Sequence, residues 1–426
     1  MRKSFFWLGF LIGLGFFVLN SQTISAQGLI LDSLIAQALQ VNPNLKSAEL
    51  RYEEYLAKVP QAGSLPDPMF QTTLSNISTK SWTLGKTSSS GIEFMFSQSI
   101  PFFGKLGLAK KSTQSMAEKT KKDYDATKNF IISELKKNYY QLYLLHKSIE
   151  ITQANKQLLE DFAKIGATKY SVGEGLQQDV LKAQVEVSKM IAELLDLEEM
   201  RKTTQAKLNI LLNRNPQDSL GKPEELSFKE INYSEENLQN LAIQNNPAIK
   251  GIEFMIRSSE LEYKLAQREY WPNLLLSFSY MKMKDDANMS SNPEKDFVSA
   301  SIGLELPLYF WTKQKKMVQE KRLDLKATRK EYEGMKNELK SEVSMLFYSL
   351  NKYKKEMELL KTVILPQAQQ SLESAKFAYQ VNKVDFLTLL DNQVTLYNYE
   401  IDYQKKLASY LQTLAQLEET IGKPLF

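Results

Sequence analysis

Four short segments of the chain alternate apolar and polar residues with a period of two. They span residues 69–77, 91–100, 273–283 and 297–306. In the second segment Ile92, Phe94 and Phe96 fall on one face, whereas Glu93 and Ser97 fall on the other. The pattern predicts four β-strands, each with one apolar and one polar face.

The length of these strands bears on what covers their apolar faces. A strand of about 9–11 residues is long enough to cross an outer membrane with its apolar face in lipid. The alternative is a sheet that is half-buried against a soluble core. The remaining sequence offers no segment to form a globular core behind the strands, so we favour the membrane.

Outside the strands, apolar residues recur every three or four positions, which predicts helices. The predicted helices span residues 29–62, 104–170, 176–212, 235–269, 312–379 and 385–421, and Pro366 is expected to kink the fifth. A helix over 104–170 is ~100 Å long at 1.5 Å per residue. Because a single helix of that length needs partners, we interpret apolar positions such as Leu387, Leu390 and Val394 as coiled-coil contacts.

The chain contains two copies of one unit. "ALQVNPNL" at Ala38–Leu45 matches "AIQNNPAI" at Ala242–Ile249, and Tyr170 matches Tyr379 further along. The pattern in each half predicts a helix, two strands, a very long helix and a last helix, in this order. The predicted organisation is a signal peptide over 1–26, a first repeat over 27–216, a linker over 217–234 and a second repeat over 235–426.

The first 26 residues have the three parts of a secretory signal peptide. Arg2 and Lys3 are basic, residues 5–19 are apolar, and Ala26 is the predicted cleavage position. The alternative, a transmembrane anchor, needs about 20 apolar residues, and this run is shorter. The leader therefore predicts export.

Aromatic residues gather where each strand pair meets a long helix. Proline ends a strand and is accepted in the first turn of a helix, and both junctions contain one, Pro101 and Pro307. Aromatic side chains prefer the membrane–water interface. We therefore predict an interface girdle of Phe102, Phe103, Trp271, Tyr309, Phe310 and Trp311, with Lys105 and Lys313 beyond it in water.

The composition excludes several kinds of chemistry. The chain has no cysteine and one histidine, His146, which lies at a packing position. No zinc site, catalytic triad or Cys/His pair fits this inventory, so we predict no enzyme, no cofactor and no metal site. A net charge of +4 gives no case for nucleic acid. Met281, Met283 and Met289 cluster near a loop where a soft metal would find thioethers, although ordinary strand filling explains them too. Asp285 and Asp286 fall in the same loop, which we interpret as extracellular.

Four strands are too few to close a transmembrane barrel, which needs about eight or more. An open sheet edge in lipid leaves backbone groups without hydrogen bonds. The chain must therefore associate with copies of itself. Two copies supply eight strands and three supply twelve.

Several motifs, in this order and duplicated, resemble the TolC family of outer membrane efflux proteins. They are "NPNL" and "NPAI", "AGSLPDPMF", "SQSIPFFGKLGLAKK", "YSVGEGLQQDVLKAQ", "YQVNKVDFLTLLDNQ" and "IGKPL". The resemblance covers the mature chain. It implies a mainly α fold with a small β part, in which long antiparallel helical hairpins form an α-barrel in the periplasm. Four strands per chain form a 12-stranded β-barrel of a homotrimer in the outer membrane.

The resemblance also implies partners and a substrate class. Family members dock a periplasmic adaptor (membrane fusion) protein and an inner-membrane pump of the RND type. "LPDPMF" followed by "SQSIPFFGKL" is closest to the heavy-metal branch of CusC-like and CzcC-like proteins. A multidrug or type I secretion channel is the alternative within the family. A periplasmic coiled-coil adaptor or structural protein is the alternative outside it.

The same resemblance places the narrowest part of the pore at the two turns that end the helical hairpins. In the second turn Asn382 replaces a glycine, and asparagine accepts the left-handed backbone that glycine would take. Thr388 stands where a pore aspartate is expected, while Asp179 and Asp391 are kept, with a solvated helix face as their alternative. The implied gate residues are Tyr170, Gly173, Asp179, Tyr379, Asn382, Asp385, Thr388 and Asp391.

Overall fold

The computed structural model describes residues 29–80, 82–87, 89–284 and 294–426. The first half consists of α1 (Leu31–Val41), α2 (Pro43–Ala62), β1 (Met69–Ser75), β2 (Ser90–Ile100), α3 (Lys105–Ser171) and α4 (Gln177–Leu211). The second half repeats this order with α5 (Glu235–Asn245), α6 (Pro247–Arg268), β3 (Asn273–Lys284), β4 (Glu294–Glu305), α7 (Gln314–Leu359), the π-helical turn η1 (Leu360–Ile364), α8 (Leu365–Gln380) and α9 (Phe386–Ile421). The predicted signal peptide and the loop residues Asp285, Asp286 and Met289 lie outside the described residues.

The helices predicted over 29–62 and 235–269 are each two helices, so the prediction of one continuous helix was wrong. Both breaks fall at an Asn-Pro pair, since the residue before a proline is disfavoured in the α conformation. The Asn42 side chain accepts hydrogen bonds from the amides of Asn44 and Leu45 at 3.0 and 3.3 Å, and thus begins α2. Asn246 begins α6 in the same way, through the Ile249 amide at 3.1 Å.

The same two asparagines also connect distant elements. The Asn42 side-chain amide donates to the carbonyl oxygen of Leu211 at 3.0 Å, at the end of α4. The Asn246 amide donates to the carbonyl oxygen of Thr420 at 2.8 Å, near the end of α9. Each Asn-Pro pair therefore ends one helix, begins the next and holds the last helix of its own repeat.

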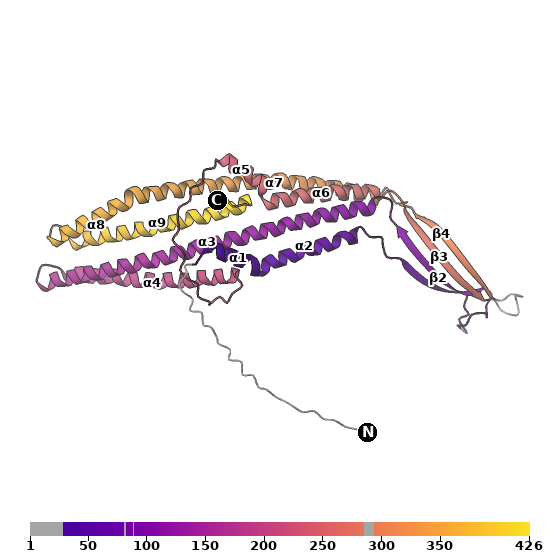
Figure 1. Ribbon diagram of the computed structural model, residues 1–426, viewed down its shortest axis with the longest axis horizontal. Coiled ribbons are helices and arrows are strands. Elements are labelled where there is room, and N and C mark those ends of the chain that lie inside the picture. The colour runs from indigo at the N-terminus through magenta and orange to yellow at the C-terminus, as the bar shows by residue number, and fades with distance from the viewer. Residues whose placement is uncertain (1–28, 81, 88, 285–293) are drawn as a thin grey trace, which may run out of the picture.

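The helix predicted over 312–379 changes direction between α7 and α8 (Figure 1). The irregularity expected at Pro366 takes the form of the π-helical turn η1, which immediately precedes it. Proline has no N–H to donate and its ring crowds the preceding turn. A widened turn accommodates both effects without ending the helix.

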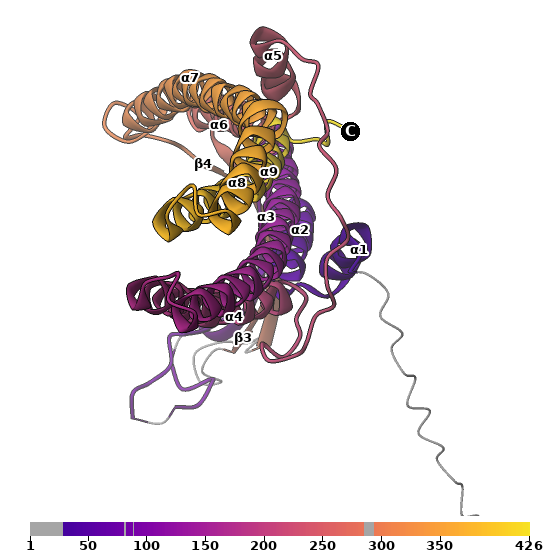
Figure 2. The ribbon, with the colours of Figure 1, turned by 90° about the vertical axis from the view of Figure 1, so that its left-hand side faces the viewer.

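The helices form a curved wall at one end of an elongated molecule, and the strands lie at the other end (Figure 1). Viewed end-on, the long helices follow an arc, and α1, α5 and the linker lie on its convex side (Figure 2). Helix α3 packs against α2, α4, α6 and α9. Within the described residues, no helix has the length and apolar composition needed to cross a membrane.

Apolar clusters hold the wall together from its middle to the hairpin ends. Leu135, Leu142 and Leu159 of α3 are fully buried, as are Leu208 of α4 and Leu417 of α9. They belong to three clusters, one among α1, α3 and α4, one mainly among α5, α7 and α9, and one near the hairpin ends. The wall is therefore as thick as one layer of packed helices. Of the predicted coiled-coil contacts, Leu390 is buried in this core and Val394 is half-buried, whereas Leu387 is 40% exposed in the protomer and lies outside it.

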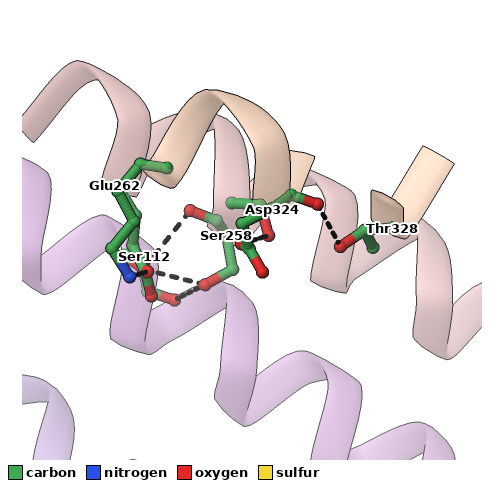
Figure 3. A network of polar contacts seen from close by, with 7 residues as sticks. Ser112, Ser258, Glu262, Asp324 and Thr328 are labelled. Atoms are coloured by element: carbon green, nitrogen blue, oxygen red, sulfur yellow. Dashed lines mark hydrogen bonds and ion pairs between the residues drawn. The ribbon is translucent and has the colours of Figure 1, made fainter. Parts of the chain in front are cut away.

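Nearer the sheet, hydroxyl groups connect α3, α6 and α7 (Figure 3). The Ser112 and Ser258 hydroxyls lie 2.8 Å apart, and Ser112 also contacts a Glu262 carboxylate oxygen at 3.4 Å. Ser259 donates to Asp324 of α7 at 3.0 Å. Small side chains let the helices approach closely, and their hydrogen bonds replace apolar packing in this part of the wall.

The four strands form one antiparallel sheet in the order β1-β2-β3-β4. Their observed bounds lie within three residues of the predicted ones. Because the order is sequential, β1 and β4 are the two edges of the sheet, and neither has a partner strand within the described chain.

Candidate functional site

The register of the sheet places most of its large apolar side chains on one face, with Leu275 and Phe297 on the other. Phe96 of β2 lies opposite Phe70 of β1 and Phe278 of β3, and Phe278 in turn lies opposite Ala300 of β4. Residues two positions apart share a face, so the apolar residues of all four strands coincide. The other face presents mainly serine, threonine, glutamine and methionine.

The apolar face of this sheet is exposed. Phe96, Phe278 and Ile302 are 49%, 54% and 77% exposed. On the polar face Ser97 of the central strand β2 is 5% exposed, whereas Ser299 and Ser301 of the edge strand β4 are exposed. No helix of the described chain packs over either face. A water-soluble protein covers such a surface, so the sheet has the polarity expected of a wall with lipid outside and water inside.

The predicted aromatic girdle lies at the base of the sheet, where the strands meet the helices. The Phe102 ring stacks on the Trp271 ring with 5.0 Å between centroids, and Phe310 contacts Trp311 at the same distance. Phe103 is 85% exposed, and Tyr309 is exposed beside Trp311. The structure thus gathers all six residues around the junction.

Lys105 does not lie in water, so the prediction for it was wrong. Its side chain is buried, and its ammonium group donates to Glu269 at 3.0 Å, to the Trp271 carbonyl oxygen at 3.2 Å and to the Asn273 side-chain oxygen at 2.9 Å. These partners belong to the end of α6 and the start of β3. A buried ammonium group is costly unless hydrogen-bond acceptors replace its water, and these three acceptors do so. Lys313, at the matching position of the second repeat, is exposed as predicted.

The two hairpin turns have the same backbone. In the first turn the Glu174 amide donates to the Lys169 carbonyl oxygen at 2.8 Å, and in the second the Lys383 amide donates to that of Ala378 at 2.8 Å. This six-residue bond ends a helix with one left-handed residue. Gly173 takes that position in the first turn with φ 78°, and Asn382 takes it in the second with φ 59°. The predicted left-handed conformation of Asn382 is confirmed.

A lysine that the sequence did not single out connects the two turns. Lys169 donates to the Tyr379 carbonyl oxygen at 2.8 Å and to the Asn382 side-chain oxygen, and its ammonium group lies 4.5 Å from the centre of the Tyr379 ring. Tyr379 is buried, and burial together with the Asp179 carboxylate raises its pKa. The first repeat has Lys169 where the second has Ala378. This difference between the repeats is the only feature of the sequence that could have drawn attention to the contact of Lys169 with Tyr379 and Asn382.

The predicted gate residues divide into two groups. A cavity of about 510 Å³ between the turns is lined by one group, namely Gly173, Asp179, Tyr379, Asn382 and Asp385. The second group, Tyr170, Thr388 and Asp391, lies outside that lining and is exposed in the protomer.

Asp385 begins helix α9. Its carboxylate accepts from the Thr388 hydroxyl at 2.6 Å and from the Thr388 amide at 2.8 Å, and these bonds lower the pKa of Asp385. Thr388 thus completes a helix cap. Asp179 is half-buried at the edge of the cavity, and Asp391 points to the surface without an ion pair among the described residues.

The sequence pattern of the outer membrane efflux protein family matches residues 34–214 and 238–423. The chain belongs to this family. It is therefore an outer membrane efflux protein, and the alternative of a periplasmic adaptor falls away. The family is one of channels and not of enzymes.

Individual relatives are distant in sequence. "Toxin and drug export protein A" of Aggregatibacter actinomycetemcomitans is 24% identical over 331 residues, which cover 76% of this chain and 71% of the relative. "Cobalt-zinc-cadmium resistance protein CzcC" of Cupriavidus metallidurans is 20% identical over 406 residues, which cover 94% and 91% of the two chains. A crystal structure of CusC, described as forming a transmembrane channel, superposes with a TM-score of 0.79 at 15% identity and covers 94% of this chain and 96% of that one.

The single histidine of this efflux protein lies beside the linker. His146 is half-buried, and its Nε2 atom has no hydrogen-bond partner among the described residues. Burial, with Arg201 and Lys222 near by, lowers the pKa of His146 and thus favours the neutral ring. In the described part of the chain no three histidine or carboxylate side chains come together as a metal site.

Proposed function

We propose that the chain is the passive outer membrane channel of a tripartite exporter of heavy-metal cations. It acts as a homotrimer that docks a periplasmic adaptor protein and an inner-membrane RND-type pump, and the pump supplies the energy. The observation that carries the proposal is a sheet with its apolar face outward and both edges open, continuous with a curved wall of helices. The wall extends the same conduit into the periplasm.

The trimer follows from the need to close the sheet. Strands β1 and β4 run in opposite directions, because the four strands alternate. The β4 edge of one copy therefore pairs with the β1 edge of the next in the antiparallel sense, and closure leaves no edge in lipid. Three copies give twelve strands, as the resemblance implies. The mass of the detergent-solubilised protein, measured by light scattering with correction for detergent, tests this, and a monomer or dimer refutes it.

The aromatic residues at the base of the sheet mark the interface between the outer membrane and the water of the periplasm. Phe103 and Tyr309 are exposed there, as side chains in contact with headgroups are expected to be. We place Phe102, Phe103, Trp271, Tyr309, Phe310 and Trp311 in this girdle. The helices beyond it extend into the periplasm.

The hairpin turns form the gate at the periplasmic end. Lys169 holds the two hairpins of one protomer together, so this structure supports a closed arrangement of the turns. Asp179 and Asp391 then face the pore, where rings of carboxylates favour cations. In a planar bilayer, Lys169→Ala is expected to increase the open probability several-fold, whereas Lys164→Ala, an exposed lysine one and a half turns earlier, is expected to leave it unchanged. Equal conductance of both variants and the wild type contradicts this role.

The substrate class rests on the relatives. The cobalt-zinc-cadmium resistance relative covers 94% of this chain, and the "LPDPMF" and "SQSIPFFGKL" motifs favour the same branch. The toxin and drug export relative has the higher identity over a shorter region, which keeps a multidrug or type I secretion channel as the second candidate.

Growth of a deletion strain separates these candidates. We expect sensitivity to Cu, Ag, Zn, Co or Cd salts that the wild-type gene restores, with unchanged tolerance of hydrophobic drugs. Drug sensitivity alone refutes metal export and leaves the channel architecture in place.

A further inference from the structure

We infer that the polar face of the sheet holds a binding site for a soft monovalent cation, Cu(I) or Ag(I), near the end of the barrel that is remote from the helices. Its ligands are the thioethers of Met281 and Met283 and the carboxylate of Glu93. The inference rests on the proposed export of metal cations and narrows it to one chemical class.

The register brings these three side chains to neighbouring positions on one face. Met281 of β3 lies opposite Glu93 of β2, and Met283 lies opposite Gly91. Opposite residues have Cβ atoms about 5 Å apart, and residues two apart on a strand lie roughly 7 Å apart. All three side chains are therefore within reach of one ion. Met95 lies opposite Ser279, roughly 13 Å along the strands from Met283, which is too far for the two thioethers to share an ion.

Gly91 leaves the space that Met281 uses. The terminal methyl carbon of Met281 lies 3.0 Å from the position that a Cβ atom at residue 91 would take. The Met281 side chain thus leans across β2 toward the row that contains Met283, instead of extending away from it. A glycine at this position brings two thioethers toward each other.

These methionines are not explained by a protein core. No helix of the described chain covers the sheet, and the neighbouring positions on the same face are mainly serines, such as Ser97, Ser277 and Ser299. Most large apolar side chains occupy the opposite face, and Leu275 and Phe297 are the exceptions. Phe297 lies opposite Met281 on β4. A sulfur–aromatic contact with this ring would account for Met281 and would leave Met283 unexplained.

The donor set selects the ion. Thioethers are soft, neutral ligands that suit Cu(I), whereas harder divalent cations prefer oxygen and imidazole ligands. The Glu93 carboxylate supplies the negative charge. Lys295 lies opposite Met283, so the ion is expected nearer to Glu93 than to the loop end. A conducting pathway needs weak, exchangeable binding, and micromolar affinity is sufficient.

Silver is the appropriate probe because Ag(I) is stable to oxidation and redox cycling. We would titrate the purified full-length mature protein in chloride-free buffer with silver nitrate by calorimetry, expecting one saturable site per protomer. The double variant M281L/M283L keeps the side-chain volume and is expected to bind at least tenfold more weakly. The matched control M200L/M345L changes two methionines that are 52% and 62% exposed on the helices, and it is expected to bind as the wild type does. Equal affinity of M281L/M283L and the wild type overturns the inference.

A second measurement needs no variant, so it tests the site even if M281L/M283L fails to assemble. Mild peroxide oxidises exposed methionines, and mass spectrometry reports each site. Silver is expected to slow oxidation of Met281 and Met283 at least fivefold relative to Met200 and Met345, and equal rates overturn the site. Silver binding together with a metal-tolerant deletion strain refutes the proposed export and keeps the site. A metal-sensitive strain without silver binding refutes the site alone.

Discussion

Replacing Lys105 with methionine tests whether the junction between the sheet and the helices depends on one buried charge. Methionine keeps the length and the apolar stem of the side chain and removes the ammonium group. Three acceptors lose their donor, namely Glu269, the Trp271 carbonyl oxygen and the Asn273 side chain. Asn273 also accepts from the Phe102 amide at 3.3 Å and donates to Glu305 at 3.1 Å, so the change reaches both strand pairs.

The expected loss of stability follows from these contacts. A hydrogen bond to a charged group contributes about 1.5–3 kcal/mol net, and a buried group left without its partner costs about as much. Glu269 is 33% exposed and regains water, which reduces its share. The sum for the junction is therefore about 2–4 kcal/mol, below the cost of breaking a fully buried pair.

Unfolding rates are the suitable assay, because membrane channels in detergent rarely unfold reversibly. Tryptophan fluorescence reports the event, since Trp271 is part of the junction. If the junction opens in the transition state, unfolding at fixed temperature accelerates ~30-fold to ~900-fold for these energies. Lys313→Met is the matched control, because Lys313 is exposed at the equivalent position, and it should change the rate less than about twofold. Equal rates for the two variants refute the reasoning.

Three further predictions concern the ends and the packing of the helices. Asn42→Ala and Asn246→Ala each remove a cap and a contact to the last helix of a repeat. Each should destabilise the folded state by about 1–2 kcal/mol and accelerate unfolding by up to about 5-fold to 30-fold in the same rate assay. Gly173→Ala forces a Cβ into a left-handed position at a cost of about 1–2 kcal/mol. Asn382→Gly keeps the left-handed conformation and removes one acceptor of Lys169, so it should destabilise the turn less, and limited proteolysis of the turns distinguishes the two variants. Burial raises the pKa of Glu400 above its usual 4.5, so the folded state favours the neutral acid. The stabilising effect is complete below pH 4.5 and lost as the pH rises through the folded pKa. Glu400→Gln should therefore stabilise the protein at pH 8 by at most about 1 kcal/mol, which is measured as a higher melting temperature. At pH 4 the melting temperature should be unchanged.

The strands and their faces were predictable because the alternation of apolar and polar residues lies within each strand. The pairing of the strands agrees with this pattern and does not change it. Once Phe94 and Phe278 must share a face, a shift of one residue would place every apolar side chain in water. The long helices were predictable for the same reason, since their apolar positions recur over many turns. A break of one residue does not interrupt the periodicity enough to be seen. The breaks at Asn42 and Asn246 were therefore missed, and each predicted helix is two helices in the structure.

The contacts that the sequence did not reveal connect residues far apart in the chain. Lys105 finds Glu269 and Asn273 only because α6 and β3 converge on the start of α3. Lys169 reaches Tyr379 across 210 positions. No local pattern marks a lysine for burial, and only the assembled fold determines which of its neighbours are acceptors.

The turns show that the repeats share a backbone and differ in charge, which has consequences for the proposed gate. Their matching hydrogen bonds, from Glu174 to Lys169 and from Lys383 to Ala378, set an offset of 209 residues. At this offset Asp179 corresponds to Thr388, and Asp391 corresponds to Lys182, which is equally exposed.

In the proposed trimer we therefore expect three Asp391 carboxylates to alternate with three Lys182 ammonium groups at one level, so that their charges cancel. Cation preference would then depend on the Asp179 level. We expect Lys182→Ala to raise the cation-to-anion permeability ratio at least about twofold, Asp391→Ala to lower it by a similar factor, and the double variant to match the wild type, because opposite charges at one level screen each other. Reversal potentials in a salt gradient measure the ratio. An unchanged ratio in Lys182→Ala means that this side chain faces away from the pore, so that the Asp391 ring carries its full negative charge.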